Sequence, residues 1–181
     1  MHESSMMSGA APIVVMGVAG SGKSTIARIL ATRQSRPFVD ADDFHSDGNK
    51  LKMSRGLPLD DRDRAPWLVD LSHELTRQPA PVLACSALKR RYRDVLRSRA
   101  PMVFFAHLAG SGQTITKRLL ARQHEFMSPD LLGSQLASLE PLGADEWGFT
   151  CDLGRKPEDL VDAILDAASS TVCPTDLMPG R

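Results

Sequence analysis

Short apolar segments alternate along the chain with longer segments in which apolar residues recur every three or four positions. We expect the short segments to be buried strands, at residues 12–16, 37–40, 81–85, 103–108 and 148–153. The periodic segments predict helices, at residues 24–33, 67–75, 114–123, 128–139 and 157–168. Because strands that alternate with helices form parallel sheets with helices on both faces, the pattern predicts an α/β fold around a five-stranded parallel sheet.

The two ends of the chain lie outside this pattern. Residues 1–11 are small and polar and lack a basic stretch followed by an apolar one, so we expect a disordered extension without a signal peptide. Residues 171–181 contain two prolines and a glycine, which predicts a flexible tail. The length between them, residues 12–170, suits a single domain with a full-sized core.

Composition argues against several classes of protein. The 22 basic residues balance the 22 acidic ones, so a basic nucleic-acid-binding protein is not expected. No apolar run is long enough to span a membrane. The three cysteines form no paired motif, so we expect neither a disulfide framework nor a zinc site. They indicate instead a protein of the reducing cytoplasm, with Cys85 and Cys151 buried.

A glycine-rich segment follows the first predicted strand directly. It matches the phosphate-binding pattern G-x-x-x-x-G-K-[ST] with Gly17, Val18, Ala19, Gly20, Ser21, Gly22, Lys23 and Ser24. Its N–H groups and the following helix N-terminus would cradle the phosphates of ATP. Lys23 would reach the β- and γ-phosphates, Ser24 would bind Mg²⁺, and Thr25 would complete the nucleotide site. The alternative is a glycine-rich turn with a chance lysine, which the flanking strand and helix disfavour.

An acidic segment follows the second predicted strand. It reads Asp40-Ala41-Asp42-Asp43-Phe44-His45, and in an extended chain Asp40 and Asp42 would point to the same side. Beside a phosphate loop, one carboxylate suits Mg²⁺ and the other suits a general base for an attacking hydroxyl. The alternative is a solvated acidic turn that caps a helix, in which His45 would be structural or exposed.

The order of residues around these motifs resembles that of the P-loop gluconokinases. The resemblance extends from about residue 13 to residue 168. It is carried by Asp40–His45, Asn49, Lys52, Met53, Gly56, Pro58, Leu59, Asp61, Asp63, Arg64, Pro66, Trp67 and Leu68; by Cys85–Lys89, Tyr92 and Arg93; and by Arg118, Leu119, Arg122, His124–Met127, Leu131, Leu132, Ser134–Leu136 and Leu139–Pro141. The chain departs from the family pattern at Ser46-Asp47-Gly48, where a proline is expected, and at Lys50-Leu51.

This resemblance implies a three-layer P-loop kinase fold, similar to that of shikimate kinase, with a mobile helical lid over about residues 111–140. It implies transfer of the ATP γ-phosphate to the 6-hydroxyl of D-gluconate, with ATP and Mg²⁺ as cofactors, and a homodimer. Asp42 would be the catalytic base, and Asp40 would bind Mg²⁺ with Ser24 or contact the substrate. Arg118 would bind the nucleotide from the lid, and Arg122 would join Lys23 in catalysis.

The chemistry of gluconate suits several further side chains. Gluconate is a polyol with one carboxylate, which Arg64 could hold with two parallel N–H donors, unless it forms a surface ion pair with Asp61 or Asp63. In the basic run after the third strand, the motif favours Lys89 and Arg93 as substrate contacts, and Arg90 and Arg91 as a solvated helix face. Hydroxyl contacts are expected from Ser86 and Gln135, a further substrate contact from His45, and a core position for Trp67.

Two other functions fit parts of the sequence. The phosphate loop and the fold also permit a kinase for another small hydroxy acid, such as shikimate. A non-catalytic nucleotide-binding regulator is the third possibility, which the presence of Lys23, Ser24, Asp40 and Asp42 together disfavours.

Overall fold

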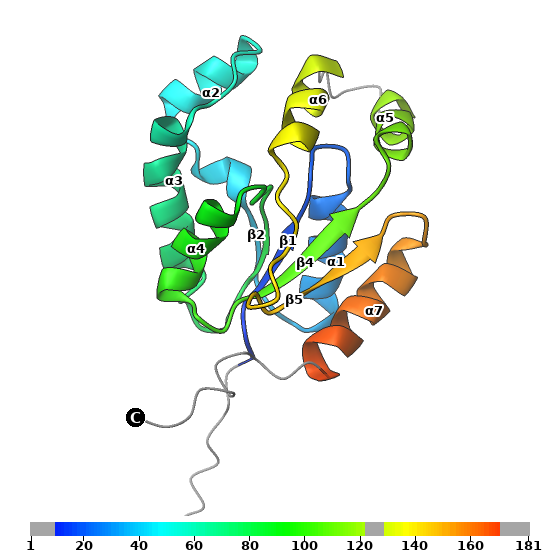
Figure 1. Ribbon diagram of the computed structural model, residues 1–181. Coiled ribbons are helices and arrows are strands. Elements are labelled where there is room, and N and C mark those ends of the chain that lie inside the picture. Colours follow the sequence, from blue (N-terminus) through cyan, green and yellow to red (C-terminus); the bar gives the residue numbers. More distant parts are fainter. Residues whose placement is uncertain (1–9, 122–128, 171–181) are drawn as a thin grey trace, which may run out of the picture.

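The computed structural model describes residues 10–121 and 129–170, and its centre is a five-stranded sheet (Figure 1). The strands are β1 (Ile13–Met16), β2 (Phe38–Asp40), β3 (Val82–Ala84), β4 (Phe104–Ala109) and β5 (Gly148–Asp152). They lie in the order β2-β3-β1-β4-β5, and every neighbouring pair is parallel. The five predicted strands are confirmed, with ends that differ from the expected ones by at most one residue.

Helices and one 3₁₀ turn connect the strands. They are α1 (Lys23–Arg33), η1 (Ala41–Phe44), α2 (Asp47–Ser54), α3 (Asp61–Glu74), α4 (Arg90–Arg99), α5 (Gly112–Ala121), α6 (Pro129–Ser138) and α7 (Pro157–Ser170). The predicted helices correspond to α1, α3, α5, α6 and α7. Residues 122, 123 and 128 of the predicted helices lie outside the described residues, as do most of the predicted N-terminal extension and the whole predicted tail.

Local side-chain bonds explain where α2 and α3 begin. The prediction for α3 followed its apolar stripe, which starts at Trp67, but the helix begins six residues earlier at a capping box. In that box the Asp60 carboxylate accepts from the Asp63 N–H at 2.8 Å, and the Asp63 carboxylate accepts from the Asp60 N–H at 3.0 Å. The helix α2 was not predicted, because its one buried residue is Asn49 and it has no apolar stripe.

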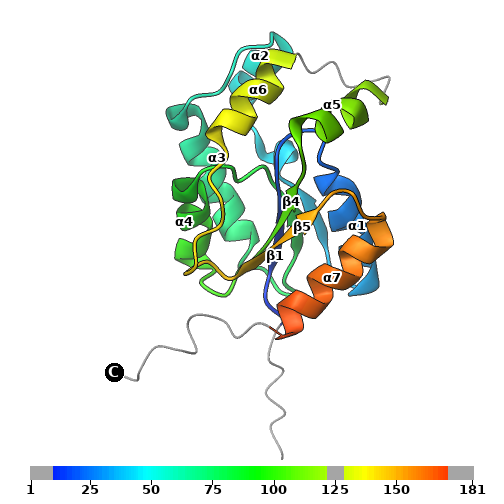
Figure 2. The same ribbon diagram turned by 45° about the vertical axis from the view of Figure 1, so that its right-hand side comes forward.

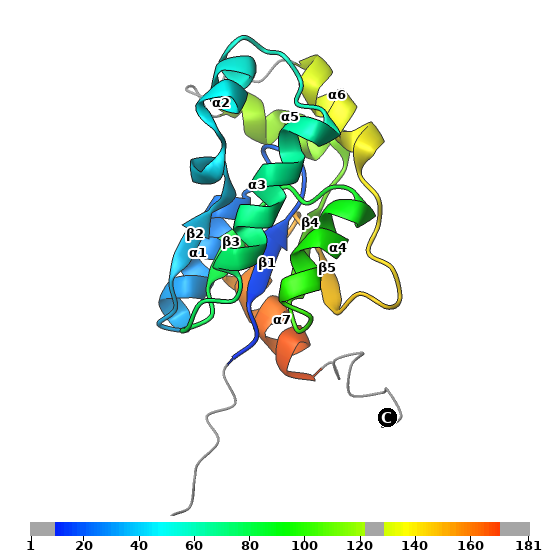
Figure 3. The ribbon, with the colours of Figure 1, turned by 90° about the vertical axis from the view of Figure 1, so that its left-hand side faces the viewer.

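Two helical layers cover the sheet. Alternate strand residues point to opposite faces, so Ile13 and Val15 pack beneath α1 and α7, and Val14 packs beneath α3 and α4. Figure 3 shows α3 and α4 in front of the sheet, with α1 and α7 behind it. This is the expected three-layer arrangement.

The carboxyl ends of all five strands lie at one edge of the sheet. The loops after β1 and β3 run side by side there, because the Cys85 N–H donates to Val15 at 3.1 Å and the Gly17 N–H donates to Ser86 at 3.3 Å. In Figures 1 and 2, α2, α5 and α6 lie beyond this edge. The predicted lid corresponds to α5 and α6, and its mobility stays a prediction. None of the described helices combines the length and apolar character that a membrane span requires.

Candidate active site

The phosphate loop makes a tight turn between β1 and α1. Gly17 has φ 145°, and a Cβ there would lie 2.8 Å from the Leu108 carbonyl oxygen. Gly20 has φ 77°, and a Cβ there would lie 2.5 Å from Leu119 of α5. Both positions therefore require glycine. At the start of α1, Gly22 is the N-cap and provides no side-chain bond, so the first N–H groups of the helix keep their capacity to bind an anion.

Lys23, Ser24 and Asp40 lie together below this loop. The Lys23 ammonium donates to the Val18 carbonyl at 3.0 Å, within its own loop. The Ser24 hydroxyl donates to Asp40 at 3.1 Å, which brings together the two predicted Mg²⁺ ligands. Within residues 10–121 and 129–170, no group of three or more His, Cys, Asp or Glu side chains forms a metal site. A hydroxyl and a carboxylate oxygen side by side suit a magnesium ion that takes its remaining ligands from water and phosphate oxygens, as Mg²⁺ commonly does.

The acidic segment after β2 does not continue as an extended chain. Asp40 ends the strand, its carboxylate accepts from the Asp42 N–H at 3.2 Å, and the backbone turns into η1. The expectation that Asp40 and Asp42 project to one side of an extended chain was therefore wrong, since the aspartate caps a 3₁₀ turn instead. Both side chains nevertheless line the same cavity. Partial desolvation in the cavity and the neighbouring Asp40 charge raise the pKa of Asp42 above its ordinary value.

His45 lies between Asp42 and Trp67. Its ring stacks on the indole with centroids 4.4 Å apart and an angle of 12° between the planes. Its Nε2 is 3.9 Å from Asp42 Oδ1, and burial lowers the pKa of the imidazole. The indole Nε1 donates to the Ala41 carbonyl at 2.7 Å, so Trp67, a core residue as predicted, also holds η1 in place.

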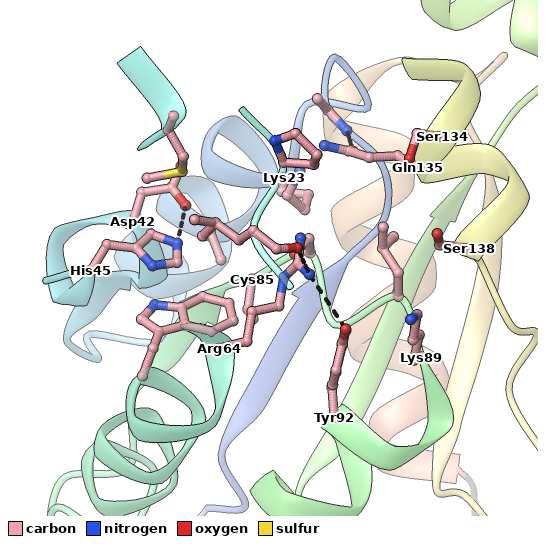
Figure 4. Close-up of a pocket in the computed structure, with 18 of the residues that line it drawn as sticks. Lys23, Asp42, His45, Arg64, Cys85, Lys89, Tyr92, Ser134, Gln135 and Ser138 are labelled. Atoms are coloured by element: carbon pink, nitrogen blue, oxygen red, sulfur yellow. Dashed lines mark hydrogen bonds and ion pairs between the residues drawn. The ribbon is translucent and has the colours of Figure 1, made fainter. Parts of the chain in front are cut away.

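A cavity of about 710 Å³ joins these groups to the loop after β3 (Figure 4). Its wall near the phosphate loop contains Ala19, Gly20, Gly22, Lys23, Ser24 and Thr25. A second part of its wall, which begins at Ser86 beside the phosphate loop, contains Asp61, Arg64, Ser86, Lys89 and Tyr92. Cys85 also lies on the wall, and burial raises the pKa of its thiol to about 12, so it is protonated at neutral pH. Cys85 and Cys151 are buried without a disulfide, as predicted.

Tyr92 lies among the charged side chains in the second part of the cavity wall. Its hydroxyl donates to Asp61 at 2.5 Å, and the Lys89 ammonium lies 3.6 Å from the same carboxylate oxygen. The guanidinium of Arg64 and the ammonium of Lys89 lie 5.7 and 5.6 Å from the centre of the Tyr92 ring. Arg64 donates to the Leu59 carbonyl, while Asp63 pairs with Lys52 at 2.6 Å. The geometry thus favours the cavity position for Arg64 over a surface ion pair.

One predicted substrate contact lies elsewhere. Arg93 has a fully buried side chain paired with Glu146 at 2.6 Å, and it does not line the cavity. The expectation that Arg93 would touch the substrate is therefore corrected. Neighbouring residues on a helix point about 100° apart, so the turn that directs Tyr92 to the cavity directs Arg93 into the protein.

The predicted lid contacts the phosphate loop through two of its helices. On α6, Gln135 accepts from the Ala19 N–H at 2.8 Å, so in this structure its amide bonds to the nucleotide loop. Gln135 also lines the cavity, as expected of a substrate contact. On α5, Arg118 donates to the Leu153 carbonyl and approaches Gly22. Arg122, the predicted catalytic arginine of the lid, lies outside the described residues.

Several cavity residues had no assigned role in the sequence analysis. Asp61 and Tyr92 belong to the motifs that carry the resemblance, so their positions were visible but their mutual hydrogen bond was not. The segment between α2 and α3 contributes Gly56, Leu57, Pro58 and Leu59 to the wall. Nothing in the chemistry of those side chains distinguishes them from an ordinary loop.

Comparisons with known proteins agree with this geometry. A family model described as shikimate kinase matches residues 19–125. A protein named gluconokinase from Gluconobacter oxydans (strain 621H) is 45% identical over 169 residues, covering 91% of this chain and 94% of that protein. A probable gluconokinase from Rattus norvegicus is 41% identical over 177 residues, covering 86% of this chain and 96% of that protein.

A solved structure extends the likeness to three dimensions. The crystal structure of a gluconokinase from Sinorhizobium meliloti 1021 superposes with a TM-score of 0.84 at 38% identity, covering 89% of this chain and 93% of that one. Sequence and fold therefore match the same group of proteins over most of their length. This chain belongs to the gluconokinase family of P-loop kinases, within the wider shikimate kinase family.

Proposed function

We propose that this protein transfers the γ-phosphate of ATP to the 6-hydroxyl of D-gluconate, giving 6-phospho-D-gluconate and ADP. The observation that carries the proposal is that one cavity contains both a phosphate loop and a group of cationic and hydroxyl side chains, in a chain of this family. The two walls suit the two substrates of a kinase.

The donor wall, which is the part of the cavity wall formed by residues 19–20 and 22–25, is suited to the phosphates of ATP. The N–H groups of residues 20–24 and the start of α1 would hold the phosphate oxygens, and Lys23 would leave the Val18 carbonyl for the β- and γ-phosphates. Ser24 and Asp40 would hold Mg²⁺, which neutralises phosphate charge when it is bound. Arg118, and Arg122 from the lid, are proposed to face the phosphates. Closure of α5 and α6 would exclude water and so limit ATP hydrolysis.

The acceptor wall, which is the second part of the cavity wall from Ser86 to Lys89 with Asp61, Arg64 and Tyr92, is suited to a hydroxy acid. Arg64 and Lys89 would hold the carboxylate, and Ser86, His45 or Gln135 would bond to the hydroxyl groups. Asp42 would accept the proton of the attacking hydroxyl, because its side chain lines the same cavity and its pKa is raised. Asp40, bonded to Ser24, remains with the metal.

A coupled assay of ADP formation tests the proposal directly. We expect turnover with D-gluconate and at least about 100-fold lower kcat/KM with shikimate or adenylylsulfate, since a site built for particular hydroxyl groups strongly rejects analogues that leave them unpaired. Preferred turnover of another hydroxy acid would replace the proposed acceptor. ATP binding without turnover of any acceptor would indicate a regulator instead.

Removing the proposed carboxylate contacts should weaken acceptor binding selectively. We expect Arg64→Met and Lys89→Met each to raise the KM for gluconate by about 10- to 100-fold, the equivalent of one charge-assisted hydrogen bond, with the KM for ATP little changed. Arg91→Met is the matched control. Arg91 pairs with the same Asp61 and lies 5.5 Å from the same Tyr92 ring, but it is not on the cavity wall. Steady-state kinetics with both substrates varied would contradict the assignment if Arg91→Met had the larger effect.

The expectations of a homodimer and of a cytoplasmic location come from the resemblance and from the cysteine content. They remain proposals, which light scattering and cell fractionation would test.

A further inference from the structure

Arg93 is the most completely bonded side chain among those described. Its exposed fraction is 0% although it is a large cation, and Glu146, also 0% exposed, neutralises it through bonds of 2.6 and 2.9 Å. Its two terminal nitrogens also donate to four backbone carbonyl oxygens at 3.2, 3.2, 3.1 and 3.0 Å, those of Ala87, Leu88, Glu140 and Pro141. The guanidinium therefore joins two chain segments that are distant in sequence.

The first segment is the acceptor wall itself. Ser86, Leu88 and Lys89 line the cavity, and Ala87 between them has φ 43°, a left-handed conformation that alanine rarely adopts. Such a conformation persists only where the surroundings hold it, and the bonds from Arg93 to the Ala87 and Leu88 carbonyls provide that hold. Without them the loop could relax, and Ser86 and Lys89 would move with it.

The second segment, Glu140 and Pro141, directly follows the C-terminal end of α6. The Glu140 N–H donates to the Leu88 carbonyl at 2.8 Å, and the Glu140 carboxylate accepts from the Arg90 N–H at 2.5 Å. Arg93 adds its own bonds to the Glu140 and Pro141 carbonyls. The helix whose last turn places Gln135 on the phosphate loop is thus anchored to the acceptor wall just beyond its C-terminal end.

We propose that Arg93 is a positioning residue for the acceptor site: it touches no substrate, but it fixes the backbone that presents Ser86 and Lys89. The inference rests on the proposed function only for the choice of acceptor. Its expected consequence is selective, because the Arg93 bonds hold the acceptor wall directly, whereas they reach the phosphate loop only indirectly, through α6 and through the bond from the Gly17 N–H to the Ser86 carbonyl. Loss of these bonds should affect acceptor binding far more than nucleotide binding.

The test is a pair of substitutions in the full-length protein. Arg93→Lys keeps the charge but cannot reach the six acceptors, since an ammonium lacks the planar fork of a guanidinium. We expect the KM for gluconate to rise by about 10-fold or more and the KM for ATP to change by less than about 2-fold. Glu146→Gln keeps the shape of the partner and should give a smaller shift in the same direction. The control is Arg97→Lys on the same helix, whose ion pairs with Asp94 and Asp145 are at the surface, and it should leave both constants unchanged.

Hydrogen–deuterium exchange provides a readout that does not depend on the acceptor. Faster exchange is expected in residues 85–89 of Arg93→Lys, with unchanged exchange in residues 20–24 of the phosphate loop. If the unaltered protein does not phosphorylate gluconate, the proposed function fails, and the exchange result still decides the role of Arg93. An unchanged KM for gluconate, or an equal rise for both substrates, would overturn the inference. If Arg93→Lys does not fold, the same criteria apply to Glu146→Gln.

Discussion

Replacing Lys23 with alanine should lower kcat by about 100-fold or more, because a positioned charge on the transferred phosphoryl group acts mainly in the transition state. The ammonium is placed for this by its own loop, where it bonds to the Val18 carbonyl 3.0 Å away. The KM for gluconate should change little, since the acceptor wall does not include Lys23. The measurement is kcat at saturating concentrations of both substrates.

Lys50→Ala is a suitable control for the loss of a lysine. Lys50 is exposed on α2 and does not line the cavity, so its replacement should leave kcat unchanged. Binding of a non-hydrolysable ATP analogue, measured by calorimetry, separates a catalytic effect from loss of the nucleotide. A Lys23→Ala protein that kept more than about one tenth of kcat would contradict the role assigned from the motif.

Asp42→Asn should lower kcat by a similar factor, about 100-fold or more, because asparagine cannot accept the proton of the attacking hydroxyl. The pH dependence gives an independent signature. A base works only when it is deprotonated, so kcat should fall as the pH decreases through the pKa of Asp42. Partial desolvation in the cavity and the charge of Asp40 raise that pKa, so the loss begins at a higher pH than the ordinary aspartate value of about 3.9 would give.

The neighbouring Asp43 gives the matched control for this experiment. It is exposed in the same 3₁₀ turn and does not line the cavity, so Asp43→Asn should keep kcat and the fall in kcat at low pH. That fall should begin at a slightly lower pH, because the Asp43 charge also raises the pKa of Asp42. The residual kcat of Asp42→Asn should not show this fall at low pH, because the group whose protonation causes it has been removed. If the Asp42→Asn protein kept nearly full kcat, the assignment of Asp42 as the catalytic base would be wrong.

The strands β1, β3 and β4 were predictable because they are buried on both faces. Their apolar runs are continuous, as in Val14 and Val15 of β1, and each ends where the backbone leaves the sheet. The helix α2 gave no such signal, since water surrounds most of it and its start depends on the bond from the Asn49 N–H to the Ser46 hydroxyl. Sequence patterns detect burial more readily than they detect single caps.

The phosphate loop was the predictable part of the candidate site, because it depends on backbone conformation. Glycines and a lysine at fixed spacing define the phosphate loop before any tertiary contact is known. The acceptor wall depends on which way each side chain points, and the motif Tyr92-Arg93 does not reveal that one residue faces the cavity and the other a buried glutamate. Likewise, nothing in the sequence indicates that Gln135 bonds to the Ala19 N–H.

The strand order also constrains how the protein is made on the ribosome. The first strand to be synthesised, β1, is the middle of the sheet, and its neighbours β3 and β4 begin at residues 82 and 104. The second, β2, pairs with β3 and not with β1. A nascent chain that ends before residue 82 therefore holds two strands of the described sheet and no pairing between them. The phosphate loop, residues 17–24, is therefore translated well before Ser86, whose carbonyl accepts from the Gly17 N–H.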